Sequence, residues 1–306
     1  MGGEILAGLK KPQKILSPKY FYDQRGSQLF DQITRLPEYY PTETEVQIMI
    51  ENLDEIVQMI GPQASLIEFG SGSSTKTHIL LANLRKLAAY VPVEISRDHL
   101  IEAAEHIAER YPEIEVLPIC ADFTKPFGLP EPQIQPIKNV VFFPGSTIGN
   151  FSPDAAQELL RTMASEAKKD GALLIGVDLK KDKATLERAY NDEAGVTAAF
   201  NLNILTRINR ELEADFDVDA FEHRAIYNEV HGRIEMHLVS LLKQSVSIAG
   251  ALIHFEDGEH LLTECSHKYS PEDFAALAEP AGFRVARVWT DANDLFSVQY
   301  LICKTA

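Results

Sequence analysis

The chain has 306 residues, of which 45% are hydrophobic and 24% are charged, a composition typical of a globular protein and not of a disordered chain or a coiled-coil rod. Its 45 acidic and 29 basic residues give a net charge of −16, which disfavours binding to nucleic-acid phosphates. The three cysteines form no C-x-x-C pair, the N-terminus lacks a signal-peptide pattern, and no apolar run could span a membrane. We therefore expect a cytoplasmic protein that binds neither nucleic acid nor membranes.

The sequence pattern of the first 180 residues predicts a short N-terminal segment followed by an α/β sheet. Residues 1–40 are expected to be irregular and aromatic, and a helix is expected from Pro41, with Thr42 and Glu45 as a capping box. Strand patterns then alternate with helix patterns across short connections. Strands are expected at residues 65–69, 90–95, 115–120, 138–143 and 171–177, and helices at 79–87, 96–110 and 152–168. This alternation is typical of a parallel sheet with right-handed crossovers.

The pattern changes after Asp178. A helix is expected at residues 185–190, and a longer one at 196–212 is expected to be broken by Asn201 and Asn203. Strands are expected at residues 225–230, 233–242, 245–254 and 260–268, followed by a helix at 270–279 and an antiparallel pair at 283–289 and 296–303. Residues 180–268 are thus predicted to be an insertion into an α/β domain, with the N-terminal aromatic segment as a candidate addition to it.

Two features indicate a nucleoside ligand. Gly70, Ser71 and Gly72 follow the first strand, at the edge where open α/β sheets bind ligands. Glu94 ends the second strand, where an acid can accept hydrogen bonds from ribose hydroxyls. The loop is neither G-x-G-x-x-G nor a P-loop, which favours S-adenosylmethionine, a donor without phosphates, over a dinucleotide.

Three further side chains could complete that site. Asp122 and Phe123 follow the third strand and suit the exocyclic amine and the ring of an adenine. Lys76 could reach the carboxylate of the ligand. Taken singly, the glycines could equally serve packing and Lys76 could be a surface lysine.

Several longer motifs are more specific than the glycine loop. They are YFYDQRGSQLF (20–30), LPEYYPT (36–42), FGSGSSTKT (69–77), PGSTIGNF (144–151), YNDEAGVTAAFNLN (190–203), EM (235–236) and TECSHK (263–268). In this order, and over nearly the whole length, the sequence closely resembles the histidine-specific methyltransferases of ergothioneine biosynthesis. The resemblance implies that S-adenosylmethionine donates three methyl groups to the α-amino group of L-histidine, giving hercynine.

The resemblance also implies an architecture. The family has a class I methyltransferase (Rossmann-like) core and a second, mixed α+β domain. In this chain the S-adenosylmethionine-binding core would comprise residues 43–179 and 269–306, and the substrate-binding domain would comprise residues 1–42 and 180–268. We expect a monomer. We also expect no metal site, because the histidines show no tight i, i+4 pairing on a clear helix.

The resemblance implies roles for individual residues of this sequence, motif by motif. The donor site would comprise Gly70, Ser71, Gly72, Lys76, Glu94, Asp122 and Phe123. The substrate carboxylate would be held by Asn150 and Tyr190, with Gly145 close by. The imidazole would be bound by Glu264 and Ser266, with Met236 shaping that end of the pocket.

Tyr22 and Tyr39 look like the aromatic residues near the reacting amine. A tyrosine hydroxyl such as that of Tyr39 could relay the amine proton, and the aromatic faces could stabilise the trimethylated cation by about 0.5–2 kcal/mol. One departure is Pro144-Gly145-Ser146, where the family commonly has two adjacent glycines; Ser146 is expected to narrow the pocket slightly.

Other functions remain open on the residues alone. Each candidate has an ordinary structural role, such as packing for Tyr39 or an outward-facing acid for Glu264. A sibling enzyme acting on a tryptophan derivative, a non-catalytic donor-binding protein and a nicotinamide dehydrogenase are the alternatives. The joint occurrence of the motifs favours the histidine methyltransferase.

Overall fold

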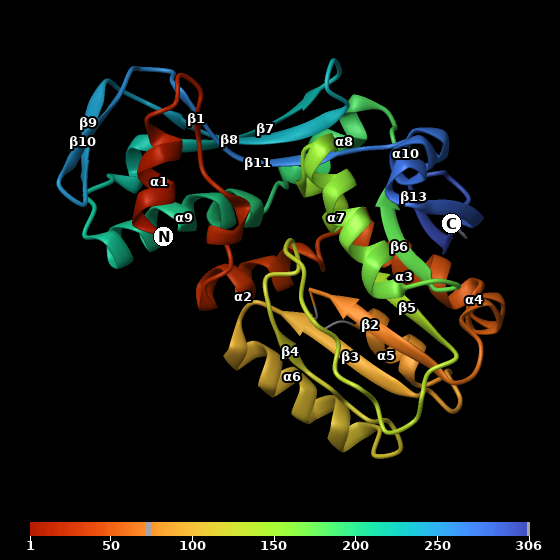
Figure 1. The fold of residues 1–306 in the computed structure, drawn as a ribbon. Helices are drawn as coiled ribbons and strands as arrows, with labels where there is room; N and C mark the ends of the chain where they lie inside the picture. The colour runs from red at the N-terminus through yellow and green to blue at the C-terminus, as the bar shows by residue number, and fades with distance from the viewer. Residues whose placement is uncertain (71–74, 305–306) are drawn as a thin grey trace. The chain divides into compact units, whose positions relative to one another are not determined.

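The computed structural model describes residues 1–70 and 75–304, which form two compact units (Figure 1). The first unit is Met1–Thr42 with Lys181–Lys268, and the second is Glu43–Lys180 with Tyr269–Ala306. Lys180, assigned to the insertion above, thus belongs to the second unit. Within the described ranges, no helix is both long and apolar enough to cross a membrane.

The second unit is built on a seven-stranded sheet of order β12-β13-β6-β5-β2-β3-β4. The strands β2 to β6 pair in parallel, whereas β13 pairs antiparallel with both β6 and β12. The strands are β2 (Ala64–Phe69), β3 (Ala89–Glu94), β4 (Ile119–Cys120), β5 (Lys138–Phe143), β6 (Ala172–Asp178), β12 (Phe283–Thr290) and β13 (Phe296–Cys303). The chain order reverses between β2 and β5, and such a switch point is where open α/β sheets bind ligands.

Helices cover both faces of this sheet. They are α3 (Tyr40–Glu51), α4 (Leu53–Ile60), α5 (Thr75–Leu81), α6 (Arg97–Arg110), α7 (Pro153–Ala167) and α10 (Pro271–Ala278), with 3-10 turns η2 (Thr147–Asn150) and η4 (Glu279–Ala281). Because side chains alternate along a strand, Leu66 of β2 packs with α3, α4 and α5, while its neighbour Ile67 packs with α7 and α10. The central strands are therefore continuously hydrophobic.

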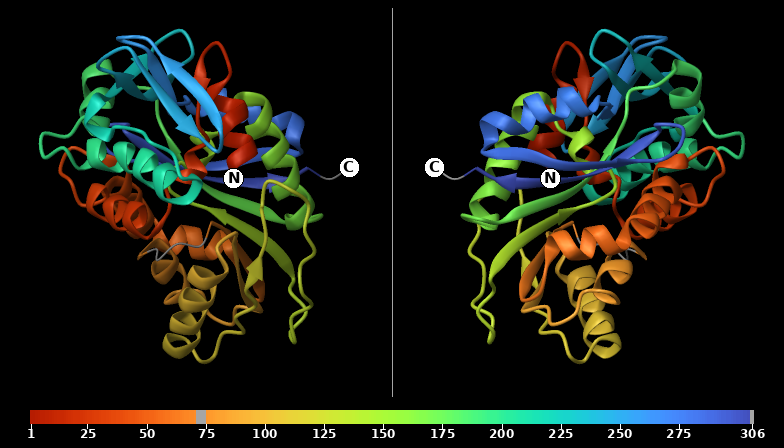
Figure 2. Two further views of the ribbon diagram at one scale, coloured as in Figure 1. Left: turned by 90° about the vertical axis from the view of Figure 1, so that its left-hand side faces the viewer. Right: turned by 90° about the vertical axis from the view of Figure 1, so that its right-hand side faces the viewer.

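The first unit contains a four-stranded sheet of order β1-β11-β8-β7 and a separate hairpin (Figure 2). The strands are β1 (Lys14–Ile15), β7 (Phe221–Asn228), β8 (Arg233–Ser240) and β11 (His260–His267), and the hairpin is β9 (Gln244–Ile248) with β10 (Ala251–Phe255). The helices are α1 (Gly2–Leu9), α2 (Gln24–Ile33), α8 (Lys183–Tyr190) and α9 (Val196–Leu212), with turns η1 (Pro18–Tyr20) and η3 (Val218–Ala220).

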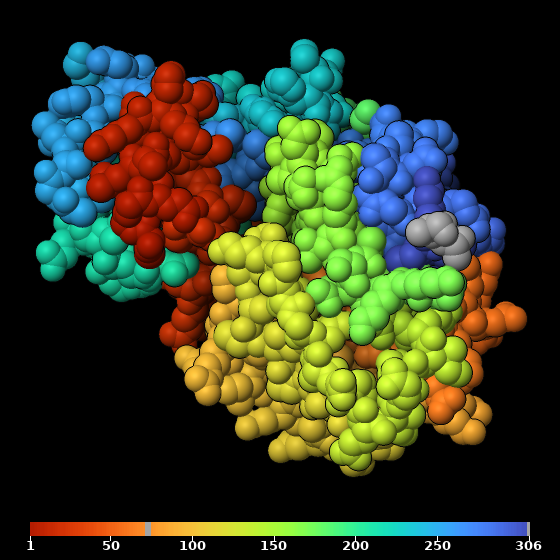
Figure 3. All heavy atoms as spheres, viewed as in Figure 1, coloured from red at the N-terminus to blue at the C-terminus, as the bar shows by residue number. Residues whose placement is uncertain are grey.

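Segments far apart in sequence share the core of this unit. Ile5 and Leu9 of α1 are buried in one cluster with Val246 and Phe255 of the hairpin. The N-terminal segment and the hairpin accordingly lie side by side on the surface (Figure 3). The 42 N-terminal residues are therefore an integral part of this unit.

Most expected elements are present, but several expectations in the two units were wrong. Residues 1–40 are not irregular, because α1 and α2 form there, the latter capped by Asp23. The third strand is shortened to Ile119–Cys120, with one isolated bridge at Val116. The helix α9 runs unbroken through Asn201 and Asn203. The single strand expected at residues 245–254 is the β9–β10 hairpin.

The proposed capping box at Thr42 was also wrong. The helix α3 begins earlier, at Tyr40, and the carboxylate of Glu45 instead accepts hydrogen bonds from the Gly145 N–H at 2.9 and 3.1 Å and pairs with the Lys76 ammonium at 2.5 Å. Glu45 is 1% exposed. A Cβ on Gly176 would lie 2.0 Å from Glu45 Oε1, so β6 needs a glycine there to admit the carboxylate.

We therefore expect Gly176→Ala to displace Glu45 and to lower the free energy of unfolding by about 1–3 kcal/mol, the usual cost of overpacking a buried site. The measurement is the urea midpoint of the variant against Gly128→Ala, whose added Cβ would meet no atom within 4 Å. Equal midpoints for the two variants would contradict this account of Gly176.

Candidate functional site

The donor-site candidates of the second unit gather at one edge of its sheet. Gly70 follows β2, Glu94 ends β3, and Asp122 with Phe123 follows β4. Since β2 to β6 run parallel, all of these positions lie at the carboxyl edge. Ser71 and Gly72 lie outside the described residues.

Aromatic rings surround Gly70 at the end of β2, on this edge of the sheet. Gly70 has φ +75°, in the left-handed region that glycine adopts without strain, and a Cβ there would lie 3.7 Å from Phe123 Cε1. The Phe123 ring packs against Phe69 and Phe143, with centroids 5.6 and 5.9 Å away. Because Gly70 has no side chain, its backbone lies directly beside an aromatic ring at the end of β2.

Two carboxylates at this edge are held by their own chain neighbours. Glu94 Oε1 accepts hydrogen bonds from the N–H groups of Ile95 and Ser96, at 2.8 and 3.1 Å. Asp122 accepts from the hydroxyl and N–H of Thr124, and the hydroxyl bond is the main reason why its pKa lies below the ordinary value. Both side chains are thereby fixed in orientation while remaining partly accessible.

Lys76 is not a surface lysine. Its side chain is 10% exposed and is paired with Glu45, which the sequence analysis assigned to a helix cap. An ammonium has three N–H donors, so the pair with Glu45 does not use up its capacity. Glu45 is thus a buried partner of both Lys76 and the Gly145 backbone, and only the three-dimensional arrangement identifies it.

Ser146 stands where the backbone is left-handed, with φ 54°. Glycine adopts this conformation without steric cost, whereas a serine there is strained. The Ser146 hydroxyl is buried and accepts a hydrogen bond from the Asp178 N–H at 2.9 Å. The turn η2 follows directly and ends at Asn150.

In the first unit, the tyrosine candidates belong to one row of aromatic rings. Tyr22 packs edge-on against Phe30 and Phe200, with centroids 5.7 and 5.8 Å away. Phe30 contacts Tyr39 at 6.4 Å, and Tyr39 contacts Tyr190 at 6.1 Å. The row therefore connects the N-terminal segment to the end of α8.

Asp23 fixes the beginning of this row. Its Oδ1 accepts hydrogen bonds from the Gly26 N–H, which caps α2, and from the Asn203 amide, while Oδ2 pairs with Arg210. Asn203 lies in the middle of α9. The N-terminal segment that carries Tyr22 is therefore tied to α9 by the asparagine that was expected to break the helix.

A β-bulge determines which face of the sheet Glu264 occupies. Along β11, Leu261 pairs with Leu238 and Leu262 with His237, but Glu264 pairs with Met236. The extra residue is Thr263, and it moves Glu264 to the face of Leu261 and Met236. Such bulges re-aim side chains near active sites.

Buried hydrogen bonds hold the bulge in place. The Thr263 hydroxyl lies 2.7 Å from Asn201 Oδ1 and 3.0 Å from the Met236 carbonyl oxygen. The Asn201 amide nitrogen donates to His223 Nδ1 at 2.8 Å, so His223 carries its proton on Nε2 and donates to the Tyr190 carbonyl at 2.8 Å. Burial lowers the pKa of His223, in keeping with this neutral form.

The same face of β11 carries the two imidazole-binding candidates. Ser266, opposite Ile234, is 4% exposed, and its hydroxyl lies 3.0 Å from the Tyr190 hydroxyl. Burial raises the pKa of Glu264 to about 7, against the opposing influence of the Lys268 charge. Lys268, which had no assigned role, is 2% exposed and donates to both Ser266 and Tyr190.

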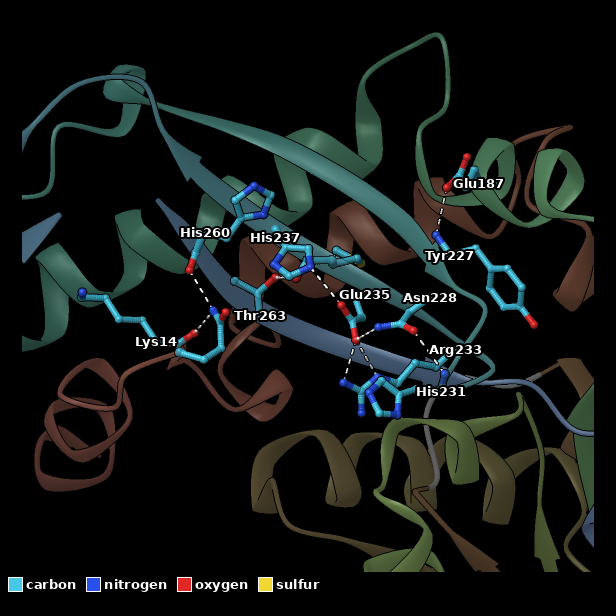
Figure 4. Close-up of polar contacts among 12 residues, drawn as sticks. Lys14, Glu187, Tyr227, Asn228, His231, Arg233, Glu235, His237, His260 and Thr263 are labelled. Carbon is cyan, nitrogen blue, oxygen red and sulfur yellow. Dashed lines mark hydrogen bonds and ion pairs between the residues drawn. The ribbon is translucent and has the colours of Figure 1, made fainter. Parts of the chain in front are cut away.

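The opposite face carries a different set of polar groups (Figure 4). Glu235 accepts hydrogen bonds from Arg233 and Asn228, and His237 Nε2 lies 3.4 Å from its other oxygen. Across residues 1–70 and 75–304, no group of three or more His, Cys, Asp or Glu side chains is arranged to hold a metal ion.

The structure therefore brings the site candidates together in two groups. The first unit contains Tyr22, Tyr39, Tyr190, Met236, Glu264 and Ser266, and the charges of Glu264 and Tyr190 both help to raise the pKa of Tyr22, after desolvation as the main cause. The second unit contains the described donor candidates together with Gly145 and Asn150.

We expect Thr263→Val to leave the buried Asn201 amide oxygen without its donor and to cost about 1–3 kcal/mol of unfolding free energy. Thr263→Ser retains the hydroxyl and should recover most of this loss. The measurement is chemical unfolding of both variants. Equal losses would instead assign the effect of the valine to packing.

Comparison with known proteins identifies related methyltransferases. A family model described as a histidine-specific, SAM-dependent methyltransferase matches residues 1–303. The chain is 45% identical over 304 residues to the histidine N-alpha-methyltransferase of Mycolicibacterium smegmatis, covering 98% of this chain and 94% of that protein. It is 43% identical to the enzyme of the same name from Mycobacterium tuberculosis, covering 94% and 90% of the two chains.

A solved structure supports the fold. An S-adenosylmethionine-dependent methyltransferase from Clostridium acetobutylicum superposes with a TM-score of 0.52 at 10% identity, covering 92% of this chain and 98% of that one. The predicted Rossmann-like methyltransferase fold is therefore confirmed. On the family match and the identity over nearly its whole length, the chain belongs to the family of histidine-specific, S-adenosylmethionine-dependent methyltransferases.

Proposed function

We propose that this protein transfers three methyl groups from S-adenosylmethionine to the α-amino group of L-histidine, producing hercynine, in the first step of ergothioneine biosynthesis. The observation that carries the proposal is the face of β11 on which Glu264 and Ser266 stand, two residues apart, opposite Met236 and Ile234. A carboxylate and a hydroxyl at this spacing suit the two nitrogens of an imidazole. The names of the most similar relatives support the same acceptor.

Acceptor selection follows from hydrogen-bonding capacity. Glu264 accepts from one ring N–H, and the Ser266 hydroxyl pairs with the other nitrogen. A side chain without two ring nitrogens would leave at least one of these groups unpaired, at about 1–3 kcal/mol for each buried group. We assign the carboxylate of the substrate to Asn150 and Tyr190, with Gly145 nearby, and the shape of the ring pocket to Met236, which is 2% exposed.

The aromatic row suits the reacting amine. Tyr22 keeps 42% of its surface accessible, yet desolvation and then the Glu264 charge raise its pKa, so its phenol stays protonated. Tyr22 therefore cannot serve readily as a base. Its proposed role is to present an aromatic face to the amine, which becomes a fixed cation after the third methylation, with Tyr39 as the candidate to relay protons.

The carboxyl edge of the second unit fits the donor. Gly70 allows close approach of the backbone, Phe123 offers a ring face for an adenine, and Glu94 can accept hydrogen bonds from ribose hydroxyls. Asp122 is proposed for the adenine amine and Lys76 for the donor carboxylate. When bound, the donor supplies a methyl group on a positively charged sulfur, so the task of the protein is orientation, worth roughly 7–11 kcal/mol.

The test is mass spectrometry of a reaction containing purified protein, S-adenosylmethionine and an equimolar panel of the standard amino acids. We expect a gain of three methyl groups on histidine alone. Methylation of tryptophan would retain the donor site but overturn the roles of Glu264 and Ser266. Binding of the donor without turnover on any amino acid would overturn the proposed enzyme activity.

We expect Glu264→Ala to weaken histidine binding at least tenfold, because the ring N–H loses a charged acceptor, which is worth about 1.5–3 kcal/mol. Donor affinity should stay within twofold. Both constants are measured by calorimetry, with Glu256→Ala, an exposed acid of the same unit, as the control. An equal loss of donor and histidine affinity would contradict the assignment of Glu264.

A further inference from the structure

Glu45 and Lys76 form a buried ion pair beside the switch point of the sheet in the second unit. The Glu45 carboxylate comes from α3, and it accepts from the Lys76 ammonium at 2.5 Å and from the Gly145 N–H at 2.9 and 3.1 Å. The two side chains are 1% and 10% exposed. A Cβ on Gly145 would lie 3.6 Å from Lys76 Nζ, so the ammonium lies beside the turn that follows β5.

The surroundings of Glu45 suit a charged carboxylate. Gly176 in β6 leaves the space that Oε1 occupies, since a Cβ there would lie 2.0 Å from this oxygen. The Gly145 N–H and the Lys76 ammonium are both donors, and donors favour the ionised form of a carboxyl group. The pair therefore sets a negative charge, and not only a hydrogen-bond acceptor, against Lys76.

The charges of the donor make such a partner useful. S-adenosylmethionine has a carboxylate, proposed above to bind Lys76, and a positively charged sulfonium only a few bonds away. A buried ammonium that attracts the carboxylate therefore also repels the sulfonium. Unit charges within about 10 Å of each other, at an effective dielectric constant of about 20, change an affinity by roughly tenfold.

We propose that Glu45 determines the specificity of the donor site for a cationic donor. Its negative charge cancels that of Lys76, so the lysine can bind the donor carboxylate without repelling the sulfonium. The inference rests on the proposed function, because it takes Lys76 as the ligand of that carboxylate. Each methyl transfer converts the sulfonium into the neutral thioether of S-adenosylhomocysteine. Without the charge of Glu45, the site would favour this product over the next donor molecule.

Other carboxylates at this edge do not replace Glu45. Glu94 and Asp122 are partly accessible and accept hydrogen bonds from their own chain neighbours, so solvent and ions screen their charges more strongly. Asp178, at the end of β6, is 1% exposed. It stays unchanged in every variant below, so its charge cancels from the comparison.

The test is calorimetry at pH 7 with S-adenosylmethionine, S-adenosylhomocysteine and sinefungin, an analogue with a protonated amine in place of the methylated sulfur. In Glu45→Gln we expect affinity for the two cationic ligands to fall roughly tenfold relative to S-adenosylhomocysteine. In Lys76→Met this preference should shift roughly tenfold the other way, and the double variant should restore the wild-type preference. Glu51→Gln, the same change at an exposed residue of α3, is the matched control.

Equal losses for all three ligands in Glu45→Gln would overturn the inference, because a structural role alone weakens cationic and neutral ligands alike. A shift for S-adenosylmethionine but not for sinefungin would overturn it too, since the effect would then follow the methyl group and not the charge. Should Glu45→Gln not fold, Lys76→Met decides alone, with an unchanged preference as the contradicting result. Failure of the wild type to bind either S-adenosyl compound would count against the proposed function instead.

Discussion

The face of the first unit that is proposed to bind the acceptor depends on one extra residue in one strand. Without the bulge at Thr263, the two-residue alternation of a strand would point Glu264 and Ser266 away from Met236 and towards the face of His237. The buried contact between Thr263 and Asn201 keeps the bulge in register, and the chain from Asn201 through His223 to Tyr190 connects it to α8. The position of the proposed ring-binding carboxylate is thus set by an uncharged hydrogen-bond network behind it.

In both units, side chains that are proposed to bind ligands are held in place by buried polar partners. Lys76 is paired with Glu45, and Ser266 is held by Lys268. In each case the buried partner fixes the position of the side chain that is proposed to contact the ligand. Pre-organisation of this kind reduces the conformational freedom that would otherwise be lost on binding.

The sequence predicted the fold class, the family and most strands of the core, because continuous apolar runs, helix caps and glycine turns are local patterns. The cap at Ser152 and the capping box at Ser270 are examples, and both are present. What it missed are long-range partners. Asn201 and Asn203 have low helix propensity, yet tertiary contacts with Thr263 and Asp23 override it. Glu45 fits a capping pattern, but its partner Gly145 lies 100 residues away.

The bulge shows the same limit at the candidate site. A pattern of alternating residues predicts which side chains share a face, but it does not reveal an inserted residue. From the pattern alone, Glu264 was therefore expected to be an outward-facing acid. Only the resemblance to a family singled it out. Lys268 lies in the same motif, and its contacts with two hydroxyls on different elements become apparent only in the structure.

The Glu45–Lys76 pair is buried and is therefore little affected by ionic strength. With a net charge of −16, the surface potential of the molecule changes strongly as salt is added. The pair itself, 1% and 10% exposed, is shielded from mobile ions, which weaken only interactions that reach the solvent. The geometry at the switch point of the sheet is therefore decoupled from the salt concentration, while the attraction of the surface for charged small molecules is not.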